Sequence, residues 1–148
     1  MIGKVIGVCV SQRKTDPKKN VGRGFLRKGF GLVGDSHAGT EKEASLLAIE
    51  SIQKLCQETG LSAGPGSFAE NITTEGVDLV SLPIGSKLQI GKAKLAVIQM
   101  GKDPSQAHTY NYQGYSILPK EGVFCKVIES GEVKIGDFVK LIKDRREN

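Results

Sequence analysis

The sequence predicts a mainly β protein of the α+β class, built as a barrel of short strands with one principal helix and short accessory helices. Short apolar segments, several of which alternate apolar and polar residues, recur along the 148-residue chain between glycine-containing turns. Only the stretch at about 41–59 places apolar residues at helical spacing over several turns. Closure of so many half-buried strands into a barrel would remove the exposed edges on which other chains can pair.

The strands are expected in a regular order along the chain. The first contains Ile6, Val8 and Val10, which alternate with Gly7 and Cys9. Alternation of this kind places the two sets of side chains on opposite faces of a strand. After the helix, further strands are expected at 67–74, 87–90, 93–100, 122–128 and 138–142.

The principal helix is expected to begin at Thr40. The Thr40 hydroxyl and the Glu43 carboxylate have the spacing of a capping box, in which each side chain bonds a free backbone N–H at the helix start. Gly60 supplies the left-handed residue that ends the helix. The apolar residues of its inner face are Ala44, Leu47, Ala48, Ile52, Leu55 and Cys56.

The chain length suits one domain, expected to cover residues 1–142, and the last residues, 143–148, form a charged tail. No apolar run approaches the roughly 20 residues that span a bilayer, and the N-terminus shows no export signal, so we expect no membrane partner and a cytoplasmic location. Cys9, Cys56 and Cys125 form no CxxC pair, which favours reduced thiols over a metal site.

Positive charge is concentrated near the N-terminus. Residues 11–30 carry seven Lys or Arg against Asp16 alone, 7 − 1 = +6, whereas the whole chain carries +5. The glycines of this segment predict an exposed loop, which either binds an anion or is simply solvated. Nucleic acid is not the expected partner, because only Phe25 and Phe30 are available there to stack on bases.

A long stretch at 101–121 lacks clear periodicity. Its first part, 101–114, holds one of the two histidines and two of the three tyrosines of the chain. Long ordered loops of this kind often carry function. The polar side chains are expected either to line a pocket or to belong to a turn-rich connection whose tyrosine rings pack on the barrel wall.

Several short motifs occur in a specific order. They are Gly34-Asp35-Ser36-His37-Ala38-Gly39, the run Phe68 to Gly76, Leu82-Pro83-Ile84-Gly85, Gly101-Lys102 and Gly136-Asp137. In this order the motifs resemble the MOSC domain, the module at the C-terminus of molybdenum cofactor sulfurases. The resemblance implies a β-barrel-like fold with a pocket for the pterin-type molybdenum cofactor or a related anionic ligand. It also implies an association with sulfur transfer, with reduction of N-hydroxylated compounds and, at the level of the family, with molybdenum ion and pyridoxal phosphate binding.

The chain departs from the family pattern in two places. Members that bind the cofactor place a cysteine just after the Gly-Lys of the long loop, where this chain has Asp103, Pro104 and Ser105. A serine hydroxyl is neither a soft metal ligand nor a sulfur nucleophile, so ordinary thiolate ligation from this position is excluded. Similar sequences also carry His-Arg-Gln where this chain has Lys42-Glu43-Ala44, so anion binding would depend on the basic segment, on Lys102 or on backbone amides.

The motifs supply eight candidate cofactor-binding residues: Arg23, Asp35, His37, Glu70, Asn71, Lys102, Ser105 and His108. Asp35 and His37 flank a tight turn, so a structural role in the turn is an alternative for both. Glu70 and Asn71 are adjacent and point to opposite faces of a strand. Glu70 is therefore the candidate pocket acid and Asn71 a backbone-bonding residue, unless both maintain the fold. No catalytic residue and no metal ligand is assigned.

Two functions are open at the level of sequence. The first is a protein of molybdenum cofactor metabolism that binds the pterin cofactor or carries sulfur, without the usual loop cysteine. The second is a non-catalytic MOSC module that binds a small anion or a protein of the same pathway. Whether the chain is an enzyme is left open.

Overall fold

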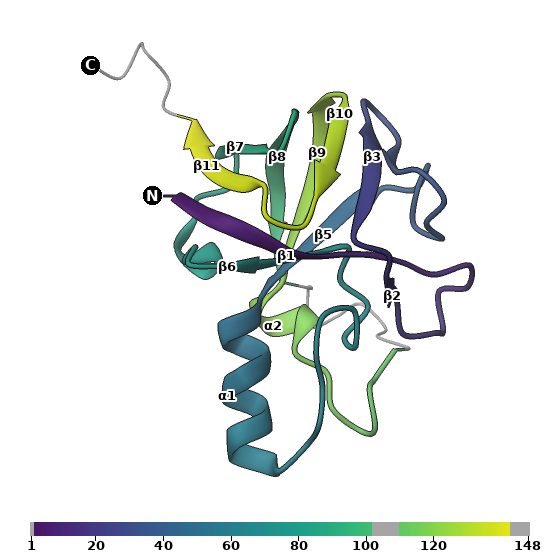
Figure 1. Ribbon diagram of the computed structural model, residues 1–148, viewed down its shortest axis with the longest axis vertical. Helices are drawn as coiled ribbons and strands as arrows, with labels where there is room; N and C mark the ends of the chain where they lie inside the picture. Colours follow the sequence, from purple (N-terminus) through teal and green to yellow (C-terminus); the bar gives the residue numbers. More distant parts are fainter. Residues whose placement is uncertain (1, 102–109, 143–148) are drawn as a thin grey trace.

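The computed structural model describes residues 2–101 and 110–142, and seven of its strands close into a barrel (Figure 1). These strands are β1 (Ile2–Val10), β5 (Ala44–Ala48), β6 (Ile72–Glu75), β7 (Lys87–Ile90), β8 (Ala93–Met100), β9 (Val123–Glu129) and β11 (Phe138–Ile142). Their hydrogen-bonded order is β11-β7-β8-β9-β5-β6-β1, and pairing of β1 with β11 closes the barrel. β5 and β6 run parallel, whereas the other neighbours are antiparallel. The mainly β fold class is confirmed.

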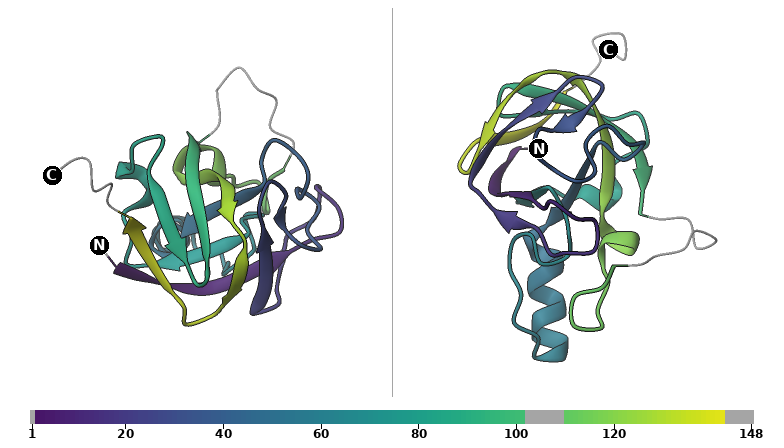
Figure 2. Two further views of the ribbon diagram at one scale, coloured as in Figure 1. Left: turned by 90° about the horizontal axis from the view of Figure 1, so that it is seen from above. Right: turned by 90° about the vertical axis from the view of Figure 1, so that its right-hand side faces the viewer.

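The remaining described strands form a smaller sheet and an extension. β10 (Gly131–Lys134), β3 (Arg23–Arg27) and β4 (Gly31–Leu32) pair in that order, and β2 (Lys19–Asn20) pairs with the end of β1. Helix α1 (Ile49–Thr59) projects from one end of the barrel, next to the short helix α2 (Leu118–Glu121) (Figure 2). A 3-10 turn, η1 (Leu79–Ser81), precedes β7. No helix in the described ranges is long and apolar enough to cross a membrane.

Two apolar clusters stabilise this arrangement. The larger one fills the barrel with side chains from all seven strands and from the small sheet, including Leu46, Ile72 and Leu95, which are fully buried. The smaller one packs α1 and α2 against the outside of the barrel and includes Ile52 and Phe124. Burial of each large apolar side chain contributes about 2 kcal/mol, so the smaller cluster also stabilises the end of the barrel beside α2.

The principal helix begins later than the sequence predicts. Residues Ala44–Ala48, expected in its first turns, form β5, and α1 begins at Ile49. β5 lies between β9 and β6 with all five residues buried, and such continuous burial resembles a helix face when only spacing is considered. The predicted capping box was therefore wrong. Thr40 Oγ1 donates to the backbone oxygen of His37, and Glu43 Oε1 accepts from the N–H of Val127 on β9.

The expected end of the helix is confirmed at Gly60, which has φ 76° and donates its N–H to the carbonyl oxygen of Cys56.

Near the N-terminus, β1 contains a bulge that the sequence did not indicate. Its register with β6 shifts between Val5 and Gly7, and beyond the shift Val8 and Cys9 are both fully buried because both faces of the strand are covered there. The simple alternation expected along this strand is interrupted there.

Most other strands lie where the sequence places them. Predicted and observed bounds agree at 87–90, 93–100 and 138–142, and β9 shifts by one residue at each end. Of the predicted strand 67–74, only β6 forms, because turns occupy the preceding residues. The basic segment 11–30, expected as a loop, contains β2 and β3 and buries Lys18. The charged tail 143–148 lies outside the described residues.

Candidate functional site

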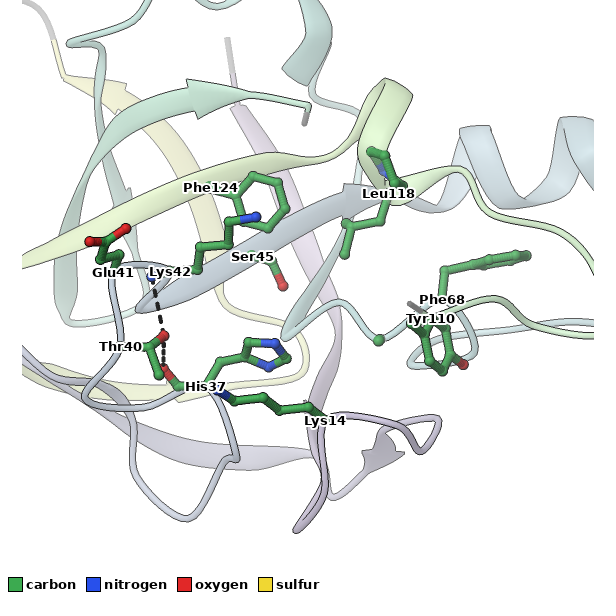
Figure 3. Close-up of a pocket in the computed structure, with 12 residues that line it drawn as sticks. Lys14, His37, Thr40, Glu41, Lys42, Ser45, Phe68, Tyr110, Leu118 and Phe124 are labelled. Atoms are coloured by element: carbon green, nitrogen blue, oxygen red, sulfur yellow. Dashed lines mark hydrogen bonds between the residues drawn. The ribbon is translucent and has the colours of Figure 1, made fainter. Parts of the chain in front are cut away.

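A pocket of about 410 Å³ opens beside α2 at the end of the barrel (Figure 3). The connection between β4 and β5 forms one side of it, and α2, β9 and the segment before β6 contribute to the other. Cavities of this size bind small molecules. The described lining residues are Lys14, His37, Thr40, Glu41, Lys42, Ser45, Phe68, Ala69, Tyr110, Leu118, Pro119 and Phe124.

Charged and apolar side chains both line the pocket. Lys14, Lys42 and Glu41 carry the formal charges of the described lining, which sum to +1. Figure 3 shows Leu118 and Phe124 across the pocket from Lys14. The Lys42 ammonium lies 4.7 Å from the centre of the Phe124 ring, a distance typical of cation–π contacts. The arrangement suits a ligand that carries both an anionic group and a flat or apolar body.

The wall formed by Phe68 and Ala69 depends on an unusual backbone. Ala69 has φ 68°, a left-handed conformation that costs a non-glycine residue about 1 kcal/mol. Gly66 has φ 88° and lies so near Lys18 that an added Cβ would be 2.1 Å from the Lys18 carbonyl oxygen. The Lys18 N–H donates to the Gly66 carbonyl oxygen over 2.9 Å. These contacts tie the pocket wall to the segment that carries Lys18.

Behind His37 lies a buried ion pair between Lys18 and Asp35. Lys18 Nζ lies 2.7 Å from Asp35 Oδ1, 3.1 Å from Ser11 Oγ and 3.3 Å from His37 Nδ1. Asp35 also accepts the backbone N–H of Ser11 at Oδ1 and that of His37 at Oδ2. Burial alone would raise the pKa of Asp35, but the hydrogen bond and charge of Lys18 outweigh burial and hold it below its usual range. Asp35 thus stays ionised and fixes the turn that carries His37.

His37 connects this ion pair to the pocket. Its side chain is 29% exposed, and Figure 3 shows its ring between Lys14 and Ser45. Burial lowers the pKa of His37 to about 4, with the charge of Lys18 acting in the same direction and Asp35 opposing both. The ring is therefore uncharged at neutral pH, and the 3.8 Å separation of Nδ1 from Asp35 Oδ2 is not an ion pair there.

Glu70 is fully buried and is not among the described lining residues of the pocket. Its Oε2 accepts hydrogen bonds from the backbone N–H of Gly66 over 3.0 Å and from the hydroxyl of Thr73 over 2.6 Å. Its Oε1 has no hydrogen-bond partner in the described part of the chain. Burial raises the pKa of Glu70, although these hydrogen bonds act against the rise. Glu70 therefore supports the turn at Gly66 from inside the protein.

Asn71 joins two strands of the barrel. Its Oδ1 accepts the backbone N–H of Ser45 on β5 over 3.0 Å, and its Nδ2 donates to the carbonyl oxygen of Cys9 on β1 over 3.2 Å. The side chain is 1% exposed, so these bonds satisfy backbone groups that water does not reach. The structure gives Asn71 a backbone-bonding position behind the pocket rather than one in its lining.

The three cysteines all lie in the described part of the chain, and none of them lines the pocket. Cys9 and Cys125 are fully buried, and burial raises the pKa of each thiol to about 12, so both are neutral at pH 7. Cys125 packs in the barrel interior, whereas the adjacent Phe124 faces the pocket. Cys56 is half-buried on α1, with Sγ 3.9 Å from the carbonyl oxygen of Ala63.

The remaining candidate residues are not in the described lining. Arg23 lies on β3, where its Nη2 is 3.1 Å from Glu132 Oε1. Lys102, Ser105 and His108 lie outside the described residues. Within 2–101 and 110–142, no group of three or more His, Cys, Asp or Glu is placed to hold a metal ion.

Sequence reasoning missed most of the apolar wall. Phe124 and Leu118 have the character of core residues, and no spacing separates a side chain facing a pocket from one facing the barrel. Tyr110 belongs to the long polar stretch that was singled out, and its hydroxyl donates to the carbonyl oxygen of Ser67 beside the pocket. Burial raises the pKa of Tyr110 to about 12, so it remains a neutral donor. Lys14 is one of seven basic residues in its segment, so nothing in the sequence singled it out as a pocket residue.

The fold is that of a small β-barrel domain with a pocket at one end of the barrel. The family model of the MOSC domain matches residues 33–140, more than half of the chain. The chain belongs to the MOSC domain family, which is related to the C-terminal domains of molybdenum cofactor sulfurases. No curated protein matches the chain by sequence.

Solved structures share the fold over nearly the whole chain. YuaD from Bacillus subtilis superposes with a TM-score of 0.73 at 21% identity, covering 94% of each chain. YiiM from Geobacillus stearothermophilus has a TM-score of 0.73 at 19% identity, covering 95% of this chain and 75% of its own. YiiM from Escherichia coli has a TM-score of 0.68 at 22% identity, covering 97% and 71%. At these identities the similarity shows the barrel fold alone.

Proposed function

We propose that this MOSC-domain protein binds an anionic pterin, the molybdenum cofactor or a closely related molecule, in the pocket beside α2. The observation that supports the proposal is the pairing of a cationic rim with an apolar aromatic wall in one cavity of about 410 Å³. A pterin phosphate has a planar ring that can contact the aromatic residues of the pocket and an anionic group that can contact its lysines.

The residues of the pocket fit the pterin part of such a cofactor. Lys14 and Lys42 would hold the phosphate together with the ring N–H of His37, and Phe68 and Phe124 would contact the planar ring. The cofactor itself would bring a redox-active molybdenum. Lys42 is already beside Phe124, so ring and anion contacts would form close together.

Molybdenum would receive no thiolate from this protein at the pocket. Each of the three cysteines is described, and each lies away from the lining. The sequence has no cysteine between 101 and 121, the stretch in which cofactor-binding relatives place one. A sulfur carrier needs an accessible thiolate at the site; the buried thiols of Cys9 and Cys125 are neutral, and the half-buried Cys56 does not line the pocket. The proposal is therefore cofactor binding without sulfur transfer through a cysteine of this chain.

A second candidate function is a non-catalytic module that binds a small anion or a protein of the same pathway. The absence of a cysteine from the described lining favours this candidate, because anion binding needs the charged side chains of the pocket and no thiolate. The two candidates differ in the ring: a pterin engages the wall at Phe68 and Phe124, whereas a simple anion does not.

The test is to purify the protein from cells supplied with molybdate, release any bound ligand by denaturation and quantify oxidised pterin by fluorescence. The wild type is compared with K14A/K42A and with the charge-matched control K126A/K134A, which removes two exposed lysines from β9 and β10. Pterin is expected with the wild type and the control and is expected to be depleted with K14A/K42A. No pterin after purification and no binding on addition of a pterin phosphate would sink the proposal, and anion binding without pterin binding would favour the second candidate.

A further inference from the structure

We infer that Lys18 is a positioning residue that fixes His37 in the Nε2–H tautomer, so that the pocket offers a neutral hydrogen-bond donor rather than a proton acceptor. The tautomer is independent of any ligand. Its use in recognition rests on the proposed function, because it concerns the oxygen of an anion bound in the same pocket.

The hydrogen bonds of Lys18 determine the tautomer. A lysine ammonium has three N–H donors and no lone pair. Three acceptor atoms surround Nζ, Asp35 Oδ1 at 2.7 Å, Ser11 Oγ at 3.1 Å and His37 Nδ1 at 3.3 Å. Each donor thus has one acceptor. Because the ammonium can only donate, Nδ1 presents its lone pair to Lys18, and the ring proton is on Nε2.

The neighbouring carboxylate does not compete for that proton. Asp35 Oδ2 lies 3.8 Å from Nδ1, beyond hydrogen-bond distance, and it already accepts the backbone N–H of His37 over 3.1 Å. Asp35 Oδ1 is occupied by Lys18 and by the N–H of Ser11. Ser11 Oγ accepts from Lys18 and lies 3.2 Å from Ser36 Oγ, to which it can donate. The hydrogen bond between Ser11 and Ser36 can run in either direction, and in both cases Lys18 remains the donor to Nδ1, which leaves Nδ1 unprotonated.

The electrostatic surroundings keep the ring neutral over a wide pH range. Lys18, Lys14 and Lys42 disfavour a positive charge on His37, whereas Asp35 favours one. Glu41 lines the same pocket. Burial and the three lysines lower the pKa of His37 to about 4. Between pH 5.5 and 8 the ring therefore carries one N–H donor and no charge.

This arrangement has a consequence for specificity. A neutral N–H beside two lysines selects ligands that present an anionic oxygen and does not remove a proton from them. Lys18 is buried and does not line the pocket, so it acts only through His37. Binding of an anion should then depend little on the ionisation of His37 between pH 5.5 and 8.

The direct test uses ¹⁵N-labelled protein and long-range ¹H–¹⁵N correlation spectra of the imidazole ring from about pH 3 to 8. The wild type is expected to show a protonated Nε2 and an unprotonated Nδ1, with a titration midpoint near 4. In folded K18M/D35N, which removes the ammonium that contacts Nδ1 and its partner carboxylate together, the Nδ1–H tautomer is expected to become populated. A protonated Nδ1 in the wild type overturns the inference, as does an unchanged tautomer in folded K18M/D35N.

A second measurement tests the role of the His37 Nε2–H in anion binding, and it does not require K18M/D35N to fold. The probe is inorganic sulfate, whose charge is constant over this pH range, titrated calorimetrically against the wild type, H37Q and H37N. Gln places its amide near Nε2 and Asn places it near Nδ1, so H37N is expected to bind sulfate about tenfold more weakly than H37Q. Equal affinities would overturn the role of the Nε2–H. If sulfate does not bind the wild type while the spectra show the Nε2–H tautomer, the role of the Nε2–H in anion binding is overturned and the role of Lys18 in fixing the tautomer stands; the pterin assay decides the proposed function separately.

Discussion

The pH dependence of stability gives a quantitative test of the environment of His37. In the unfolded chain this histidine has a pKa of 6.5, and in the folded protein burial and Lys18 lower it to about 4. Between these values the unfolded chain binds more protons at His37 than the folded protein does, so the free energy of unfolding falls as the pH falls. The contribution is complete above pH 6.5 and is lost through the window from 6.5 to 4.

The size of the loss follows from the two pKa values. One pKa unit corresponds to about 1.4 kcal/mol, so the wild type loses about 2 kcal/mol through His37 between pH 7.5 and pH 5, and about 3 kcal/mol by pH 4. H37Q does not titrate and lacks this loss. Glu70 acts in the opposite direction, because its raised pKa removes stability as the pH rises above 4.5. That contribution is common to both proteins and cancels in their difference.

The assay is urea unfolding followed by circular dichroism at half-unit steps from pH 7.5 to 4.5. The quantity compared is the free energy of unfolding of the wild type minus that of H37Q. This difference is expected to be lower at pH 5 than at pH 7.5 by about 2 kcal/mol, whatever its value at pH 7.5. A difference that stays constant across the range would refute a lowered pKa for His37 and with it the neutral donor in the pocket.

Three further predictions concern the buried groups around the pocket. E70Q is expected to gain stability relative to the wild type as the pH rises from 4.5 to 8, because the amide avoids burying a charge; urea unfolding at both ends of this range measures the gain, and a loss at pH 8 would argue against the raised pKa of Glu70. G66A is expected to cost more than about 3 kcal/mol because its Cβ meets backbone, whereas G29A, also at positive φ but with open space around it, is expected to cost about 1 kcal/mol. Equal costs would contradict the close approach at Gly66. In the native protein no more than one thiol per chain, that of Cys56, is expected to react with a thiol reagent at pH 8, rising to three in urea; fast reaction of all three before unfolding would contradict the burial of the others.

The sequence predicted β7 and β8, whose burial alternates, but it did not predict β10, which also alternates, or β5, whose burial is continuous. β7 alternates along its length and ends at the Gly91 turn, and β11 follows the turn at Gly136, so their bounds were predicted correctly. β5 is covered on both faces, and its apolar run therefore had no period to separate it from the helix that follows. The information that makes Ala44–Ala48 a strand lies in its neighbours β6 and β9, which are distant in sequence.

The candidate site was predicted only in part, for a related reason. The motif that contains Asp35 and His37 was found by its resemblance to a family, and the structure places His37 in the pocket and Asp35 behind it. Lys18 carries the network but is one of seven basic residues in its segment, and only its ion pair with Asp35, 17 residues away, marks it as buried. Phe124 likewise differs from a core residue only through the face of β9 on which it lies.

The central claim is that the pocket beside α2 binds an anionic pterin. The most direct measurement is a titration of ¹⁵N-labelled protein with 6-hydroxymethylpterin phosphate, followed by backbone amide shifts. Saturable shifts are expected at His37, Lys42, Phe68 and Phe124, with Arg23 on β3 unaffected. No saturable shifts, or shifts centred on Arg23 and the small sheet, would contradict the claim.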